Sequence, residues 1–267
     1  MRCSAGDDRR VRVSWRVDQW TVVGGTFCGR SRPVGGLCRS VQALLGIYGD
    51  AMPIPTQIRD VYDQLRTEIT WLHGRWIIYR QLYGTSEKRI DLLNESAAAF
   101  FYIVQDVLLG EIQVSLSKLT DPARTGAHEN LSLELLQSRL ETVGDTGLAG
   151  KTRVTLGVLR SRCAAFRTWR NKKLAHLDLL TSMQATADPL PGISRQMVED
   201  ALKLVRDFMN EIEKHYNDAE FGYEHFSMQS DGEALVAILR YGLRYEELLT
   251  ERSMSYDDIR DGKWHNA

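Results

Sequence analysis

The chain has few cysteines and lacks the sequence signals of several common enzyme classes. Its 267 residues include four cysteines, and none of them forms a paired CxxC spacing. We therefore expect neither a zinc site nor a disulfide framework, and the protein is expected in a reducing compartment. A GxxxxGKS/T loop, a GxGxxG turn and a GxSxG elbow are also absent. Their absence removes the usual signals for nucleotide hydrolysis, dinucleotide binding and serine hydrolysis.

Long hydrophobic runs and an export signal are missing as well. No stretch reaches the roughly 18 continuous apolar residues needed to cross a bilayer. After the pair Arg9-Arg10, the charged residues Arg12, Arg16 and Asp18 interrupt the apolar run that an export signal needs. The histidines show no HxxxH pairing with a carboxylate, so neither a metal nor another cofactor is expected. These observations predict a soluble, cytoplasmic protein without a membrane partner.

Composition divides the chain near Met52. Residues 1–51 contain eight of the 21 glycines, eight arginines, no lysine and no periodic apolar face. We interpret them as a leader that is disordered or wrongly joined to the reading frame, with a flexible functional tail as the alternative. The eight arginines and four acids of this leader give +4, so residues 52–267 carry −5 of the net charge of −1. Such a mildly acidic body disfavours a protein that coats RNA in general.

Helical periodicity and capping residues organise the rest of the chain. We expect a helical domain over residues 52–218 and an extension with one helix over residues 219–267. The apolar spacing and the capping residues predict helices over residues 55–83, from 85–86 to about 119, after Ser132, from about 149 to 176, after Ser194 and over 233–250. Strand alternation is absent, so five to six helices predict an all-α, up-and-down helical bundle.

The residues best suited to phosphate binding and proton transfer lie at the end of the fourth expected helix. They read Arg170-Asn171-Lys172-Lys173-Leu174-Ala175-His176-Leu177-Asp178. From residue 146 to residue 177 the chain has eight Lys and Arg residues and no Asp or Glu. Arginine binds phosphate oxygens, and histidine, with an ordinary pKa of about 6.5, transfers protons near neutral pH. The alternative is that the cations neutralise a helix C-terminus while His176 caps its last carbonyls or packs beside Trp169.

Three stretches together resemble the AbiU-type branch of the HEPN superfamily. They are residues 79–84, the segment that runs from 89–94 to 119–122, and residues 170–178. The resemblance covers roughly residues 55–215. It implies a helical bundle that acts in abortive infection or a toxin–antitoxin system as a homodimeric, metal-independent endoribonuclease. The alternative that it leaves open is a non-catalytic module that dimerises, binds a nucleotide or holds a partner.

The family's signature is an arginine followed a few residues later by a histidine. This spacing occurs at Arg66 and His73, again at Arg170 and His176, and near the C-terminus. Only the pair Arg170 and His176 combines a helical context with a neighbouring asparagine, Asn171. The resemblance therefore transfers to this middle pair alone.

The resemblance assigns a role to each residue of the motif. His176 would be the general acid or base, Arg170 would bind the scissile phosphate, and Asn171 would orient the phosphate or the imidazole. RNA would be the substrate and a cognate antitoxin a possible partner. The neighbouring cations are expected to bind RNA: Arg167, Lys172 and Lys173.

Helix geometry restricts how these residues can meet. Residues six apart on an ideal α-helix are separated by about 120° around its axis, so Arg170 and His176 do not share a face. Either the helix ends or bends between them, or two chains face each other so that one chain's His176 works beside the other's Arg170. The resemblance favours the second arrangement, which is a two-fold dimer.

Overall fold

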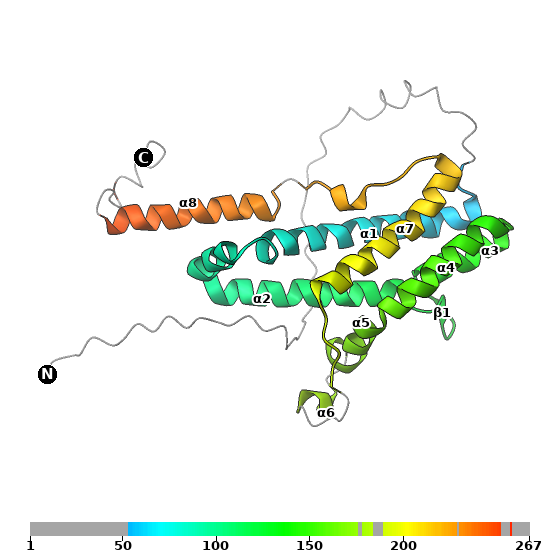
Figure 1. Cartoon of the computed structure of the whole chain (residues 1–267), viewed down its shortest axis with the longest axis horizontal. Helices are drawn as coiled ribbons and strands as arrows, with labels where there is room; N and C mark the ends of the chain where they lie inside the picture. The colour runs from blue at the N-terminus through cyan, green and yellow to red at the C-terminus, as the bar shows by residue number, and fades with distance from the viewer. Residues whose placement is uncertain (1–52, 176–177, 184–188, 229, 252–256, 258–267) are drawn as a thin grey trace, which may run out of the picture.

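The chain is almost entirely helical in the residues that the structure describes. The computed structural model describes residues 53–175, 178–183, 189–228, 230–251 and 257 (Figure 1). The assignments to residues 1–51 and to His176 therefore lie outside the described residues. The helices are α1 (Thr56–Tyr83), α2 (Glu87–Leu119), α3 (Leu133–Val143), α4 (Thr146–Arg162), α5 (Ala164–Trp169), α6 (Leu179–Ser182), α7 (Arg195–Asn217) and α8 (Gly232–Thr250). The predicted all-α bundle is confirmed.

Three short elements complete this part of the chain. An antiparallel hairpin connects α2 to α3. Its strands, β1 (Arg124–Thr125) and β2 (His128–Glu129), have two residues each. A π-helical turn (Arg170–Leu174) follows α5, and a 3-10 turn (Tyr223–His225) lies between α7 and α8.

Serine caps set the start of three helices, as the sequence predicts. The hydroxyls of Ser86, Ser132 and Ser194 each accept a hydrogen bond from the backbone N–H three residues further on. These bonds satisfy one of the donors that the first turn of a helix leaves without an intrahelical acceptor. Because a cap is a local interaction, it is visible in the sequence.

The core lies between long antiparallel helices. Figure 1 shows α1 beside α2 and α4 beside α7, and the contacts between these pairs are extensive. The apolar stripe of α1 is buried along its whole length, as Ile58, Leu65 and Ile69 illustrate with an exposure of 0%. Each such side chain contributes about 1.5–3 kcal/mol through burial. The bundle is therefore held by its apolar stripes.

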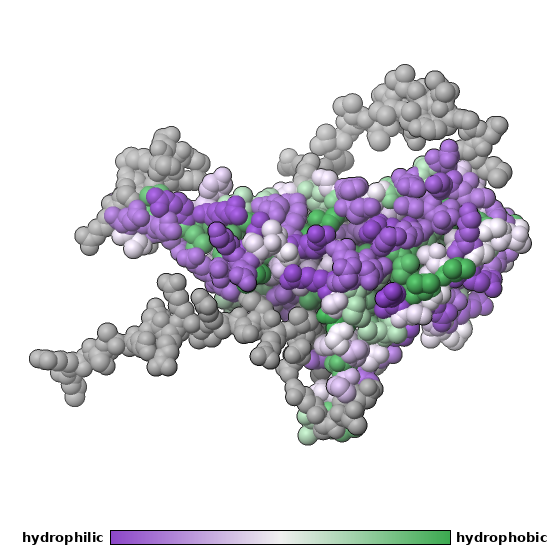
Figure 2. Space-filling model, in the orientation of Figure 1, coloured by the Kyte–Doolittle hydropathy of each residue, from purple (hydrophilic) through white to green (hydrophobic). Residues whose placement is uncertain are grey.

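α2 combines great length with an apolar composition. By length and composition it could cross a membrane. An 18-residue window of the helix has a mean hydropathy of 1.4, and 28% of that window is buried. Core helices of soluble bundles meet the same criterion, and α2 packs against α1, α5 and α8. The face shown in Figure 2 is largely hydrophilic, with apolar side chains gathered over α4, where Val154 and Val158 are exposed.

The expectation of one continuous helix over residues 149–176 is wrong. The carboxylate of Asp145 caps Leu148, so α4 begins earlier than expected, at Thr146. Cys163 then ends α4, and a separate helix, α5, begins at Ala164. α4 packs along α7 whereas α5 packs against α2. The break at Cys163 therefore lets the chain leave one neighbour for another.

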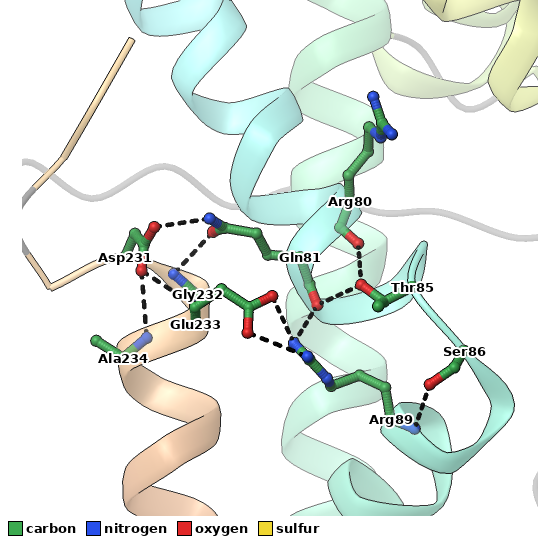
Figure 3. A network of polar contacts seen from close by, with 9 residues as sticks. All are labelled: Arg80, Gln81, Thr85, Ser86, Arg89, Asp231, Gly232, Glu233 and Ala234. Carbon is green, nitrogen blue, oxygen red and sulfur yellow. Dashed lines mark hydrogen bonds and ion pairs between the residues drawn. The ribbon is translucent and has the colours of Figure 1, made fainter. Parts of the chain in front are cut away.

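A polar network joins α8 to the ends of α1 and α2 (Figure 3). Arg89, which is 8% exposed, donates to the Gln81 carbonyl at 2.7 Å and to both carboxylate oxygens of Glu233 at 3.0 and 3.1 Å. The side chain of Gln81 bonds Asp231 and the backbone N–H of Gly232. The helix expected in the C-terminal extension is thus present and is docked on the bundle.

We expect Arg89→Ala to loosen α8. The substitution removes three hydrogen bonds, leaves the Gln81 carbonyl with the Thr85 hydroxyl as its donor and removes the ion-pair partner of Glu233, which together are expected to cost about 1–3 kcal/mol. Hydrogen exchange of the α8 amides should accelerate, while exchange in α3 should not. Arg244→Ala is the control, because Arg244 lies on α8 itself and pairs with Glu247 at an exposed position. Unchanged exchange in α8 of the Arg89 variant would show that the network does not hold the helix.

The signature-like histidine of α1 is a core residue. His73 is 2% exposed, its Nδ1 lies 2.9 Å from the carbonyl oxygen of Ile69, and its Nε2 lies 3.4 Å from a nitrogen of Arg206. Burial, reinforced by the positive charge of Arg206, lowers the pKa of His73 to about 4. The side chain is therefore neutral at pH 7, and Nδ1 is placed to donate to the Ile69 carbonyl.

This histidine predicts a loss of stability in mild acid. Between pH 6.5 and pH 4 an unfolded histidine takes up a proton that folded His73 does not, so stability falls as pH decreases, by about 3 kcal/mol over this window. Urea titrations at pH 7 and pH 4.5 measure the free energy of unfolding at each pH. Between these two pH values it should fall less in His73→Gln than in the parent. His128→Gln, at an exposed hairpin position, should behave like the parent. A parent and His73 variant with equal pH dependence would contradict this assignment.

Candidate functional site

Arg170 begins the π-helical turn that follows α5. The Ala175 N–H donates to the Arg170 carbonyl at 2.8 Å, five residues back instead of four. Such widened turns occur frequently at functional sites. No side chain of the turn is buried. The separation of about 120° that applies to an ideal α-helix therefore does not carry over to this turn.

A carboxylate from the far end of α2 fixes the guanidinium of Arg170. The Nη1 group donates to both oxygens of Asp121, at 2.8 and 2.7 Å, and Nε donates to the Asn171 side-chain oxygen at 3.1 Å. The side chains of Arg170 and Asp121 are 19% and 23% exposed. The bonds to two different side chains restrict the orientation of the guanidinium.

Arg167, predicted to bind RNA, contacts the C-terminus of α2. Its Nη2 donates to the Thr120 carbonyl at 3.1 Å and to the Thr120 hydroxyl at 2.7 Å. Thr120 is 1% exposed, so this arginine supplies donors to buried oxygens at a helix end. Together with the Arg170–Asp121 pair, this contact attaches the segment that carries the motif to the end of α2.

The other polar residues of the turn are at least partly accessible. Asn171 is exposed, whereas Lys172 and Lys173 are half-buried. The Nζ of Lys173 lies 5.5 Å from the centre of the Trp169 ring, a cation–π contact. The carbonyl of Lys172 accepts from the backbone N–H of Asp178 at 3.1 Å. The structure thus brings Arg170, Asn171 and the two lysines onto one turn.

Trp169 connects this turn to the loop that precedes α7. The indole is 6% exposed, and its Nε1 donates to the Pro191 carbonyl at 2.7 Å. The tryptophan therefore acts as a packed anchor beneath Lys173.

The acid-free stretch of sequence does not form an unpaired basic surface. Carboxylates from α3 and α7 reach the cations of α4 across the helix interfaces. The pairs are Lys151 with Glu211, Arg153 with Glu141, and Arg160 with Glu134. Sequence reasoning missed these partners, and Asp121 as the partner of Arg170, because they lie in other segments of the chain.

The described residues add neither a reactive cysteine nor a metal-binding cluster to the motif. Burial raises the pKa of the Cys163 thiol to about 12, so this cysteine is not a nucleophile at neutral pH. Among the residues that the structure describes, no group of three or more His, Cys, Asp or Glu side chains is placed to hold a metal ion. The turn carries an oriented guanidinium that is bonded to the Asn171 side chain, and two lysines lie on the same turn. Such groups bind a phosphate.

These features define the class of the protein, an all-α bundle with an Arg-Asn turn at the end of a helix. The family model HEPN_AbiU2, described as AbiU2, matches residues 56–235. The chain therefore belongs to the HEPN AbiU2 family, and its domain is related to abortive infection. The match begins with α1 and extends into α8. Comparisons with curated proteins and with solved structures gave no match.

Proposed function

We propose that this protein is a metal-independent endoribonuclease that acts as a toxin or defence effector in abortive infection. The observation that carries the proposal is the oriented Arg170, held by Asp121 on a π-helical turn in a domain of the AbiU2 family. A guanidinium fixed before substrate arrives loses little freedom when it binds a phosphate. Its place of action would be the cytoplasm, where RNA is available.

In the proposed reaction the RNA 2′-hydroxyl attacks the adjacent phosphorus. A bond forms between the 2′-oxygen and phosphorus, the bond to the 5′-oxygen breaks, and the products are a 2′,3′-cyclic phosphate and a 5′-hydroxyl. His176 would take the proton from the 2′-hydroxyl or give one to the leaving oxygen. Arg170 would bind the phosphate oxygens as negative charge grows, and Asn171, bonded to its Nε, would keep it in place.

A homodimer would complete the site. Two copies related by a two-fold axis present the same surface to each other, so each His176 can meet the partner's Arg170. Lys172 and Lys173 would line the groove between the copies and attract RNA, with Arg167 behind them. A cognate antitoxin would act by covering this groove.

One observation favours a second function, a non-catalytic HEPN module that binds a partner or a nucleotide. The guanidinium of Arg170 already has a carboxylate partner at 2.7 Å, so a phosphate must compete with Asp121 for it. A structural ion pair needs no substrate, and such a module would use the bundle only for association.

The deciding experiment is incubation of the purified full chain with tRNA and total cellular RNA in EDTA. Cleavage that leaves 2′,3′-cyclic phosphate ends would support the endoribonuclease. Light scattering on the same sample tests the dimer. A folded dimer that leaves every RNA intact would favour the non-catalytic module, and cleavage that EDTA abolishes would contradict the metal-independent mechanism.

A further inference from the structure

A cavity of about 340 Å³ lies where the end of α1, the middle of α2 and the start of α7 meet. Its size is that of a small-ligand site. The rings of Tyr79 and Tyr83 form part of its wall, and the amides of Gln105 and Gln113 contribute polar groups. Among the described residues that line it, Arg195 is the one that carries a charge. The cavity is therefore apolar on one side and electropositive at one end.

The electropositive end is the first turn of a long helix. α7 has 23 residues, and Ser194 caps it through the Met197 N–H at 3.2 Å. The other amides of a first turn have no intrahelical acceptor, and the helix dipole favours negative charge there. Arg195 adds a full charge at the same place, and its Nη2 is anchored on the Tyr83 carbonyl at 2.7 Å.

One amide in the cavity wall has an unsatisfied oxygen. Gln113 is 1% exposed, and its side-chain oxygen has no hydrogen-bond partner in the described part of the chain. Leaving a buried acceptor unpaired costs about 1–3 kcal/mol. A donor supplied by a bound molecule would satisfy this oxygen. This observation is independent of the helix terminus.

We propose that the cavity binds a small organic anion that carries a ring and an N–H or O–H group. Its carboxylate or phosphate would sit on Arg195 and the first turn of α7, and its ring would lie against Ile90 and Ile193, the apolar lining residues that are partly exposed. Its N–H or O–H group would donate to the oxygen of Gln113. The site uses none of the residues around Arg170 and does not depend on the proposed ribonuclease activity.

The test is calorimetric titration of the full chain with three probes. Indole-3-carboxylate represents ring-bearing carboxylates, adenosine 5′-monophosphate represents ring-bearing phosphates, and inorganic phosphate represents the anion alone. We expect saturable binding of at least one ring-bearing probe, at least about tenfold tighter than that of inorganic phosphate, which corresponds to about 1.4 kcal/mol. Which of the two binds identifies the anionic group. No saturable binding of either at millimolar concentration would overturn the proposal.

Two variants locate the binding. Gln113→Leu should weaken binding about tenfold while leaving the unliganded protein as stable as the parent or more so, because it removes an unsatisfied acceptor. Arg195→Gln should weaken binding to a similar degree. It tests the location of the site independently if Gln113→Leu does not fold. Arg153→Gln, on the exposed side of α4, is the matched control. Binding that is equal in all three variants would place the ligand elsewhere. Because the readout is binding, a negative result leaves the ribonuclease proposal standing.

Discussion

His176→Ala is expected to lower the rate of RNA cleavage by the full chain by a factor on the order of 10²–10⁴, the usual contribution of a general acid or base. Arg170→Ala should cost a factor on the order of 10²–10³, because it removes the group that meets the developing charge on the phosphate. Rates are measured on one RNA in EDTA under single-turnover conditions. Circular dichroism then establishes that each variant remains helical.

Matched substitutions show whether the loss is specific. His128→Ala removes a histidine from the exposed β2 strand, and Arg153→Ala removes an arginine from α4. Both should cleave like the parent. If His176→Ala keeps the activity of the parent, the assignment of His176 as the acid or base is contradicted.

Mixing the two inactive variants tests the composite site. If His176 of one chain works beside Arg170 of the other, a heterodimer of His176→Ala and Arg170→Ala contains one intact site. Random exchange of subunits makes about half of the dimers mixed, so about a quarter of the parent's activity should return. A site formed within one chain cannot be restored in this way, and continued inactivity of the mixture would contradict the proposed dimeric site.

The extent to which the sequence predicts the fold follows from the range of the interactions. The starts of α2, α3 and α7 could be predicted because Ser86, Ser132 and Ser194 bond amides only three residues away. The break at Cys163 could not, because the apolar spacing continues across it through Leu159 and Phe166, which are both buried. Packing of α5 on α2 decides where the chain turns, and that contact is not local.

The same distinction explains what was predictable of the site. The sequence places Arg170, Asn171 and the lysines together because they are neighbours. The carboxylate that orients Arg170 comes from Asp121, which is 49 residues away in the chain, so the pair needed the folded structure. The π-helical turn has no established sequence pattern, and it changes how residues of this segment face one another.

Trp169 links the predicted motif to the rest of the bundle, and Trp169→Ala is expected to destabilise the protein by about 3–5 kcal/mol. Truncation of a buried tryptophan removes apolar contacts and leaves a cavity. It also removes the Nε1 donor 2.7 Å from the Pro191 carbonyl and the ring beneath Lys173. Urea unfolding followed by circular dichroism measures the free energy of unfolding.

Trp169→Phe separates packing from the hydrogen bond. It keeps an aromatic ring but loses the donor to Pro191, so a smaller loss of about 1–2 kcal/mol is expected. In both variants, hydrogen exchange should accelerate at residues 170–174 and at the loop before α7, because Trp169 joins them, while α3 should stay protected. Accelerated exchange throughout the bundle would instead mean that Trp169 supports the core as a whole. Acceleration confined to the turn and the loop would identify it as the anchor that holds Arg170 in position.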